Sequence, residues 1–235
     1  ENLRRFNAEV AMLAQWDDHE VTNNWFWQKR LDGDPRYREK SVAVLAARGA
    51  RAFMEYMPVR QHPLETGRLH GSFRWGPSLE VFRIDMRSYR GPNGDGQETE
   101  LVPDARILGA QQVRWLKQAL LASDATWKVI AADMPLGVIV WNDAQNRRGA
   151  EAVSQGDPGE AKGRELEIAE LLTFIARNRP GPDHFRVLPE EVESRLFADG
   201  TTEGGRARLV CDAIARMTDS VAAHTYKRLF DADFG

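Results

Sequence analysis

The periodicity of the apolar residues changes near residue 180, and this change constrains the fold more than any other feature. Before it, apolar runs typical of strands alternate with amphipathic helical patterns, whereas only helical patterns follow it. Strands are predicted over 10–16, 68–75, 79–86 and 126–133, and helices over 3–9, 41–57, 109–122 and 164–178. We therefore expect a mixed α/β (α+β) fold that is followed by an all-helical C-terminal segment.

The stretch "NRPGPDH" at 178–184 carries the strongest boundary signal, because proline and glycine interrupt both helices and strands. It predicts two parts, 1–179 and 180–235, and the second contains a long predicted helix over 205–230. Between the last predicted strand and the boundary, residues 142–163 are polar and rich in glycine, which predicts a long loop.

Composition excludes several classes of protein. The formal net charge is −3, so there is no electrostatic case for a nucleic-acid-binding surface. No apolar stretch approaches the roughly 20 residues of a membrane span. Cys211 is the single cysteine, which rules out an internal disulfide bond. Of the five histidines, His62 and His70 flank a polar loop and are expected to be solvated.

The segment "WDDHEVTNNW" at 16–25 places carboxylates, a histidine and two asparagines between tryptophans. Unpaired charge is costly to bury, so such a cluster needs a metal, a partner or a pocket. Carboxylate, amide and imidazole groups are ligands of hard and borderline cations. The alternative is a capped turn in which Asp18 accepts backbone hydrogen bonds. Residue types alone leave the two interpretations open, and core packing is the expected role of Trp16, Trp25 and Trp27.

Several longer stretches together resemble the PhoD-like branch of the metallophosphoesterases, the alkaline phosphatase D family. The most recognisable is "WDDHEV…NNW", and the matching stretches follow in the order of the family at similar spacing. They are "RRFNAEVAMLAQWDDHEVTNNW", "RGARAFMEYMPVR", "FRWGPSLEVFRIDMRSYRGPN", "LGAQQVRWLKQALLASDATWKVIAADMPLG" and "ELEIAELLTFIARNR". The resemblance covers residues 1–179, and the combination is far more specific than any single short motif.

This resemblance implies a metal-dependent phosphomonoesterase or phosphodiesterase that acts on a small phosphate ester. Its fold would be part of a metallophosphoesterase-type β-sandwich with flanking helices. By resemblance the cofactors are divalent or trivalent metal ions, calcium and iron, which position the phosphate and activate a water for attack on phosphorus. The family also implies a periplasmic or secreted location.

The resemblance also suggests roles for individual residues. Asp18 takes the position of a metal ligand, and His19 takes the position that stabilises the phosphoryl oxygens and assists the leaving group. Asp17, with Asn23 or Asn24, is a further candidate for the metal pocket. Arg87 is a candidate phosphate contact, because a guanidinium matches phosphate oxygens bidentately. The alternative for Arg87 is an ion pair with Asp85 or another acid.

The sequence departs from the family at two places. The first metal ligands of the family lie on a segment expected before residue 1, and its "ADVH"-like ligands should follow residue 179, where Asp183 and His184 match poorly. At most a third to a half of the ligands of the metal shell are therefore expected within the 235 residues of this sequence. This leaves a second hypothesis, a catalytically incomplete fragment or fusion whose exposed apolar surface would favour self-association.

The C-terminal stretch has a different resemblance. "ARLVCDAIARMTDSVAAHTYKRLF" at 207–230 is similar to the C-terminal helix of deoxyguanosine triphosphate triphosphohydrolases of the HD superfamily, with Asp219 in the matching "MTD". The His-Asp metal motif of that superfamily is not found in the sequence. A triphosphohydrolase is therefore the third and weakest functional hypothesis.

Overall fold

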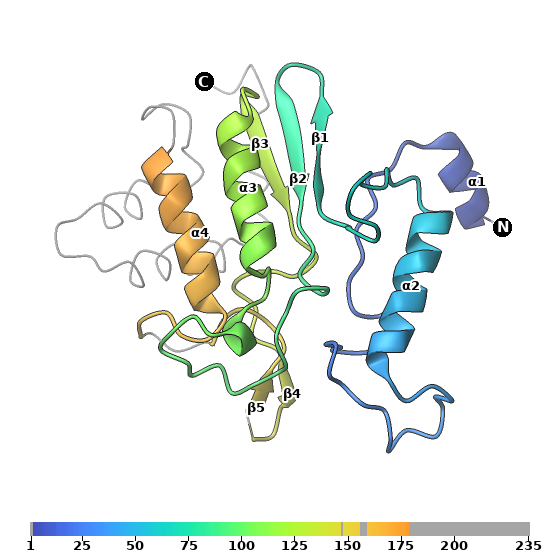
Figure 1. Ribbon diagram of the computed structural model, residues 1–235, viewed down its shortest axis with the longest axis vertical. Coiled ribbons are helices and arrows are strands. Elements are labelled where there is room, and N and C mark those ends of the chain that lie inside the picture. Colours follow the sequence, from blue (N-terminus) through green and yellow to red (C-terminus); the bar gives the residue numbers. More distant parts are fainter. Residues whose placement is uncertain (1, 147, 156–158, 179–235) are drawn as a thin grey trace.

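The computed structural model describes residues 2–146, 148–155 and 159–178 (Figure 1). Its α-helices are α1 (Asn2–Glu9), α2 (Val42–Tyr56), α3 (Ala110–Ala122) and α4 (Glu165–Asn178), with a 3₁₀ turn at Pro103–Ala105. Its strands are β1 (Gly71–Trp75), β2 (Leu79–Arg83), β3 (Trp127–Ala131), β4 (Trp141–Asp143) and β5 (Arg148–Ala150). The predicted mixed α/β class is confirmed for these residues.

The main sheet has the order β1-β2-β3, with β1 antiparallel to β2 and β2 parallel to β3. Gly76 turns the β1–β2 hairpin at a φ of 61°, a conformation that glycine adopts without strain. The parallel pair aligns Arg83 with Ala131, so the residues that follow β2 and β3 emerge at the same edge of the sheet. In α/β proteins this edge is where functional loops gather. The strands β4 and β5 form a separate antiparallel pair.

The helices α3 and α4 lie side by side, with α3 next to β3 (Figure 1). Phe82 from β2 is fully buried in one cluster with Val113 and Leu116 from α3 and Ile168 and Leu171 from α4. These positions recur at the three- and four-residue spacing from which both helices were predicted. Burying each such side chain contributes about 1.5–3 kcal/mol to folding, which makes this cluster the main core.

A second core lies around α2, which stands beyond the β1 edge of the sheet in Figure 1. Trp16 and Trp25 are 2% and 0% exposed and pack edge to face, with their ring centroids 5.4 Å apart. Val42 and Phe53 of α2 belong to the same cluster. The predicted core role of the tryptophans is therefore confirmed for these two. They also fix both ends of the polar segment between them.

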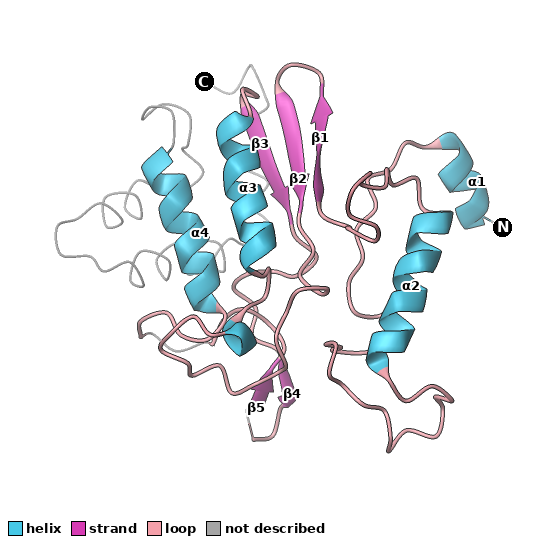
Figure 2. Cartoon of the chain, viewed as in Figure 1, coloured by secondary structure: helices cyan, strands magenta, loops and turns pink. Residues whose placement is uncertain are grey.

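Two predictions of secondary structure are wrong. Residues 10–16 were expected to form a buried strand, but they are a loop in which Val10 and Leu13 are about half exposed (Figure 2). The segment instead reaches the sheet through Gln15, whose Nε2 donates to the carbonyls of Ile84 and Ala131 at 2.7 and 3.1 Å. Residues 142–163 were expected to be a loop, but β5 and the buried Ala152 and Val153 lie within them.

The expectation that His70 is solvated is also wrong. His70 is 4% exposed and packs against Tyr89 and Trp115, with ring centroids 5.4 and 4.8 Å away. Burial in this aromatic surrounding lowers the pKa of His70 to about 3. The error arose because only the local loop was polar, while its aromatic neighbours come from later in the sequence.

The face of the sheet opposite α3 carries Phe73, Trp75 and Val129 as exposed side chains. Exposed apolar surface is thus confirmed, whereas self-association stays a prediction. In the part of the chain that the structure describes, no second sheet packs face to face on β1–β3, so the sandwich also stays a prediction. None of the described helices is long and apolar enough to cross a membrane. The predicted helix 205–230, Asp183, His184, Cys211 and Asp219 lie outside the described residues.

Candidate active site around residues 17–24

The polar segment between Trp16 and Trp25 folds as a tight turn. The backbone N–H groups of Val21 and Thr22 both donate to the carbonyl of Asp18 at 2.9 Å. The carboxylate of Glu20 accepts a hydrogen bond from the backbone N–H of Asp17 at 2.7 Å. The turn is therefore stabilised by its own polar groups, while the flanking tryptophans anchor it in the second core.

Asp18 is largely buried, with its side chain 10% exposed. Its Oδ2 accepts a hydrogen bond from the backbone N–H of Asn24 at 2.7 Å, which is the bond that the capped-turn interpretation predicted. Its Oδ1 accepts no hydrogen bond from the described residues. One oxygen of Asp18 thus has a structural role in the turn.

His19 extends into solvent, with its side chain 77% exposed. Its Nε2 lies 3.0 Å from Oδ1 of Asn23 and 3.7 Å from Oδ2 of Asp18. The hydrogen bond with Asn23 and the charge of Asp18 raise the pKa of His19 above its ordinary value of 6.5. A larger share of His19 is therefore protonated near neutral pH, which suits a donor to phosphoryl oxygens.

Arg87 and Asp17 form an ion pair in which two nitrogens of Arg87 bind one oxygen of Asp17. Nε and Nη2 of Arg87 lie 2.8 and 2.5 Å from Oδ1 of Asp17. The remaining nitrogen, Nη1 of Arg87, donates to Oε1 of Glu151. Nε also lies 3.5 Å from Oδ2 of Asp133. The ion-pair alternative for Arg87 is thus present, with Asp17 and Glu151 as partners rather than the Asp85 side chain. The phosphate contact stays a prediction.

Two further carboxylates occupy the edge where β2 and β3 end. Asp85 accepts hydrogen bonds on Oδ1 from Nε1 of Trp16 and from the backbone N–H groups of Arg87 and Ser88, at 2.9–3.1 Å. The side chain of Asp133 is 2% exposed. Burial raises the pKa of Asp133 to about 7, although the charge of Arg87 opposes the shift.

Asn24 closes the segment in a left-handed conformation with φ of 50°, which is uncommon for a residue other than glycine. Its carbonyl oxygen accepts hydrogen bonds from Nδ2 of Asn93 at 3.1 Å and from Nζ of Lys29 at 3.5 Å. With the bond from its N–H to Asp18, the Asn24 backbone is held on three sides. Strained backbone of this kind often marks functional sites.

The donor atoms of this region suit a hard cation, because they are carboxylate and amide oxygens. Nevertheless, no group of three histidine, cysteine, aspartate or glutamate residues is arranged to hold a metal ion in the described ranges 2–146, 148–155 and 159–178. Arg87 binds Oδ1 of Asp17 but not its Oδ2, and Oδ1 of Asn23 lies within hydrogen-bond distance of His19. These residues therefore fit part of a metal shell.

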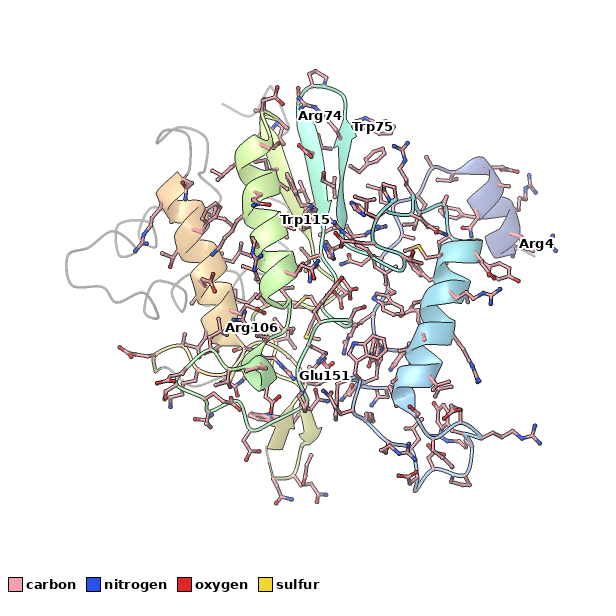
Figure 3. All side chains as sticks on the ribbon, viewed as in Figure 1. Arg4, Arg74, Trp75, Arg106, Trp115 and Glu151 are labelled. Atoms are coloured by element: carbon pink, nitrogen blue, oxygen red, sulfur yellow. The ribbon has the colours of Figure 1, made fainter. Side chains whose placement is uncertain are left out.

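The structure brings four predicted site residues together in one turn, namely Asp17, Asp18, His19 and Asn23, and joins the fifth, Arg87, to them through Asp17. Sequence reasoning missed Glu151 and Asp133. Glu151 lies next to the apolar pair Ala152 and Val153 inside an otherwise polar stretch, and this interruption was the signal that could have identified it. Figure 3 labels Glu151 between the β4–β5 pair and the lower end of α2.

Three comparisons relate the chain to known proteins. The family model described as PhoD-like phosphatase matches residues 1–182, and the one described as phosphohydrolase-associated domain matches residues 158–228. Alkaline phosphatase D of Bacillus subtilis (strain 168) is 31% identical over 141 aligned positions, and the match covers 55% of this chain and 23% of that protein. A solved structure titled "Structure of PhoD" matches 70% of this chain and 31% of its own, with 22% identity and a TM-score of 0.47.

Both resemblances seen in the sequence are thus confirmed. The second match lies mostly beyond residue 178, outside the described residues. The chain spans about a quarter of the length of the curated relative that it matches.

Proposed function

The chain belongs to the PhoD-like phosphatase family, and on this basis we propose that it contributes to metal-dependent hydrolysis of small phosphoric esters. The family match over residues 1–182 is the observation that carries this proposal. The geometry of residues 17–24 supports it, because the motif that is most recognisable in the sequence is a solvent-facing turn anchored at both ends.

The proposed ligand groups are Asp18, through Oδ1, with Asp17 and Asn23 as further oxygen donors. A cation bound there would polarise a phosphoryl oxygen and lower the pKa of a coordinated water. His19 is proposed to donate a hydrogen bond from its imidazolium to a phosphoryl oxygen and to assist departure of the alcohol. Arg87 fixes the orientation of Asp17, which stands next to Asp18 in the turn.

The same proposal includes the finer points that the sequence suggested. Residues 1–179 would form the metallophosphoesterase part, with β1–β3 as one layer of a two-layer sandwich, and 180–235 a helical part. Calcium and iron are the proposed metals. The tail adds no separate function here, because its match to a phosphohydrolase-associated domain names no reaction.

The test is hydrolysis of p-nitrophenyl phosphate and bis(p-nitrophenyl) phosphate by the full chain, after removal of metals and after addition of Ca²⁺ with Fe³⁺ or Mn²⁺. We expect metal-stimulated turnover that D18N reduces at least 100-fold. D32N is the matched control, because Asp32 is an exposed aspartate that pairs with Arg30 outside this turn. Turnover that ignores both metal and D18N would contradict the proposal.

Absence of turnover under every metal would favour the second candidate, a folded but catalytically incomplete chain. One observation favours that candidate, namely that the described residues assemble only part of a metal shell. Elemental analysis after dialysis separates the two cases, since an incomplete shell would retain little metal.

A further inference from the structure

We propose that Glu151 is a positioning residue that holds both ends of the segment Asp17–Asn24 through buried arginines. The catalytic consequence of this role rests on the proposed function, whereas the positioning itself is a property of the fold. Glu151 was not among the residues that the sequence suggested. It lies between β5 and α4, more than 120 residues after the segment that it would control.

Glu151 binds three arginines with two different groups. Its carboxylate Oε1 accepts hydrogen bonds from Nη1 of Arg87 and, at 2.6 Å, from Nη1 of Arg90. Its backbone carbonyl accepts from Nη2 of Arg90 and from Nη1 of Arg164, each at 2.7 Å. One residue therefore connects the loop that follows β2 with the start of α4.

The first connection reaches the beginning of the segment. Arg87 points Nη1 at Glu151 and presents Nε and Nη2 to Oδ1 of Asp17. A planar guanidinium held on one edge has a fixed opposite edge, so the position of Glu151 determines where Asp17 is bound.

The second connection reaches the end of the segment. Arg90 and Arg164 both donate to Oδ1 of Asn93, the latter at 3.2 Å. This fixes the amide of Asn93, and its Nδ2 then donates to the carbonyl of Asn24 at 3.1 Å. Asn24 is the residue with positive φ, so the network holds the strained end of the turn as well as its beginning.

The charges explain why a carboxylate is required. The side chains of Arg87, Arg90 and Glu151 are 3%, 0% and 4% exposed, so water cannot replace a lost partner. Glutamine at position 151 would keep the shape and an acceptor oxygen but would leave the two guanidinium charges without their shared anion. We expect the arginines to shift and both anchors of the segment to loosen.

The test is hydrogen exchange of the backbone amides in the full chain carrying Glu151→Gln. We expect exchange in residues 17–25 to accelerate about tenfold relative to the amides of α3. E167Q is the matched control, because Glu167 is a fully buried glutamate that binds Arg106 and the backbone N–H groups of 107–109, and neither of these belongs to the segment. It should leave the relative exchange of 17–25 unchanged. Equal acceleration by both variants, or none by E151Q, would overturn the proposal.

Should E151Q fail to fold, Asn93→Ala removes only the second connection and no charge. Exchange at Asn24 and Trp25 should then accelerate while the amide of Asp17 keeps its rate, and an unchanged rate at Asn24 would overturn the proposal. E151D, which keeps the anion, should restore part of the protection lost in E151Q. Failure of E151D to restore any would indicate that side-chain length, not charge, sets the position and would contradict the charge argument.

These measurements need no substrate or metal, so they distinguish this inference from the proposed function. If hydrolysis is found, E151Q should lower kcat about tenfold with little change in KM, because Glu151 lies away from the solvent-facing groups. A chain that hydrolyses nothing but shows the exchange pattern would refute the function and retain the positioning role. A chain that hydrolyses esters but lacks the exchange pattern would support the proposed function and refute the positioning role of Glu151.

Discussion

The guanidinium of Arg87 binds the carboxylate of Asp17 through two nitrogens, at 2.8 and 2.5 Å, across 70 residues of sequence. This pair joins the turn at 17–24 to the loop that leaves the central strand β2. Arg87 is 2% exposed while the Asp17 side chain is 47% exposed, so the pair links the interior to the surface of the candidate site.

Arg87→Ala should lower the free energy of unfolding by about 3–5 kcal/mol, because it removes a buried cation shared by Asp17, Asp133 and Glu151. Urea unfolding followed by tryptophan fluorescence measures the change. Arg74→Ala is the control, since Arg74 pairs with Asp124 at an exposed position and should cost less than about 1 kcal/mol. Equal losses in the two variants would contradict the buried network.

Asp133 should make the protein less stable as the pH rises from about 4 to 7. Its pKa is raised from 3.8 to about 7, so over this range the unfolded chain loses a proton that the folded chain keeps. Asp133→Asn should remove this decrease in the free energy of unfolding, which amounts to about 1.4 kcal/mol per pH unit. The test is the free energy of unfolding of both proteins, measured between pH 4 and 8. If it changes with pH in the same way in both, Asp133 ionises normally.

His70 should have the opposite dependence. Its pKa is lowered from 6.5 to about 3, so the stability linked to His70 is complete above pH 6.5 and is lost as the pH falls toward 3. His70→Phe keeps an aromatic ring between Tyr89 and Trp115. It should reduce the loss of stability as the pH falls from 6.5 toward 3. A direct check is the NMR titration of the His70 ring, where a midpoint near 6.5 would contradict its burial.

Gly109 should tolerate no side chain. It precedes α3 with φ of 76°, and an added Cβ would lie 2.9 Å from Cβ of Tyr89. Gly109→Ala should cost about 1–3 kcal/mol from backbone strain and contact. Gly33→Ala is a suitable comparison, because an added Cβ there meets nothing within 4 Å and φ lies outside the left-handed range. In thermal unfolding, Gly109→Ala should have a lower melting temperature than Gly33→Ala. Equal melting temperatures of the two variants would argue against the close contact at Gly109.

Much of the fold followed from local pattern. The helices α2, α3 and α4 were predicted within two residues of their bounds because each has an apolar stripe, and the β1–β2 hairpin because its turn contains glycine and proline. The predicted strand at 10–16 failed because an apolar run shows what can be buried but not what it pairs with. Gln15 there binds the ends of β2 and β3 by its side chain.

The site was predicted only where it is contiguous. Asp17, Asp18, His19 and Asn23 are neighbours in the sequence, so their proximity needed no knowledge of the fold. Glu151 and Asp133 reach Arg87 only after β3, β4 and β5 are placed. The apolar pair Ala152 and Val153 marks the neighbourhood of Glu151 as buried, but nothing local in the sequence indicates that Arg87 is its partner. The shifted pKa of Asp133 has the same origin, because burial is a property of the whole fold.

The most direct test of the proposed function is the hydrolysis of p-nitrophenyl phosphate by His19→Ala with saturating metal. His62→Ala serves as the control, since it removes a histidine on a different loop. We predict that kcat/KM falls at least 100-fold in the first variant and less than twofold in the second. Values of kcat/KM within twofold of the wild type for both variants would contradict a role of His19 in hydrolysis.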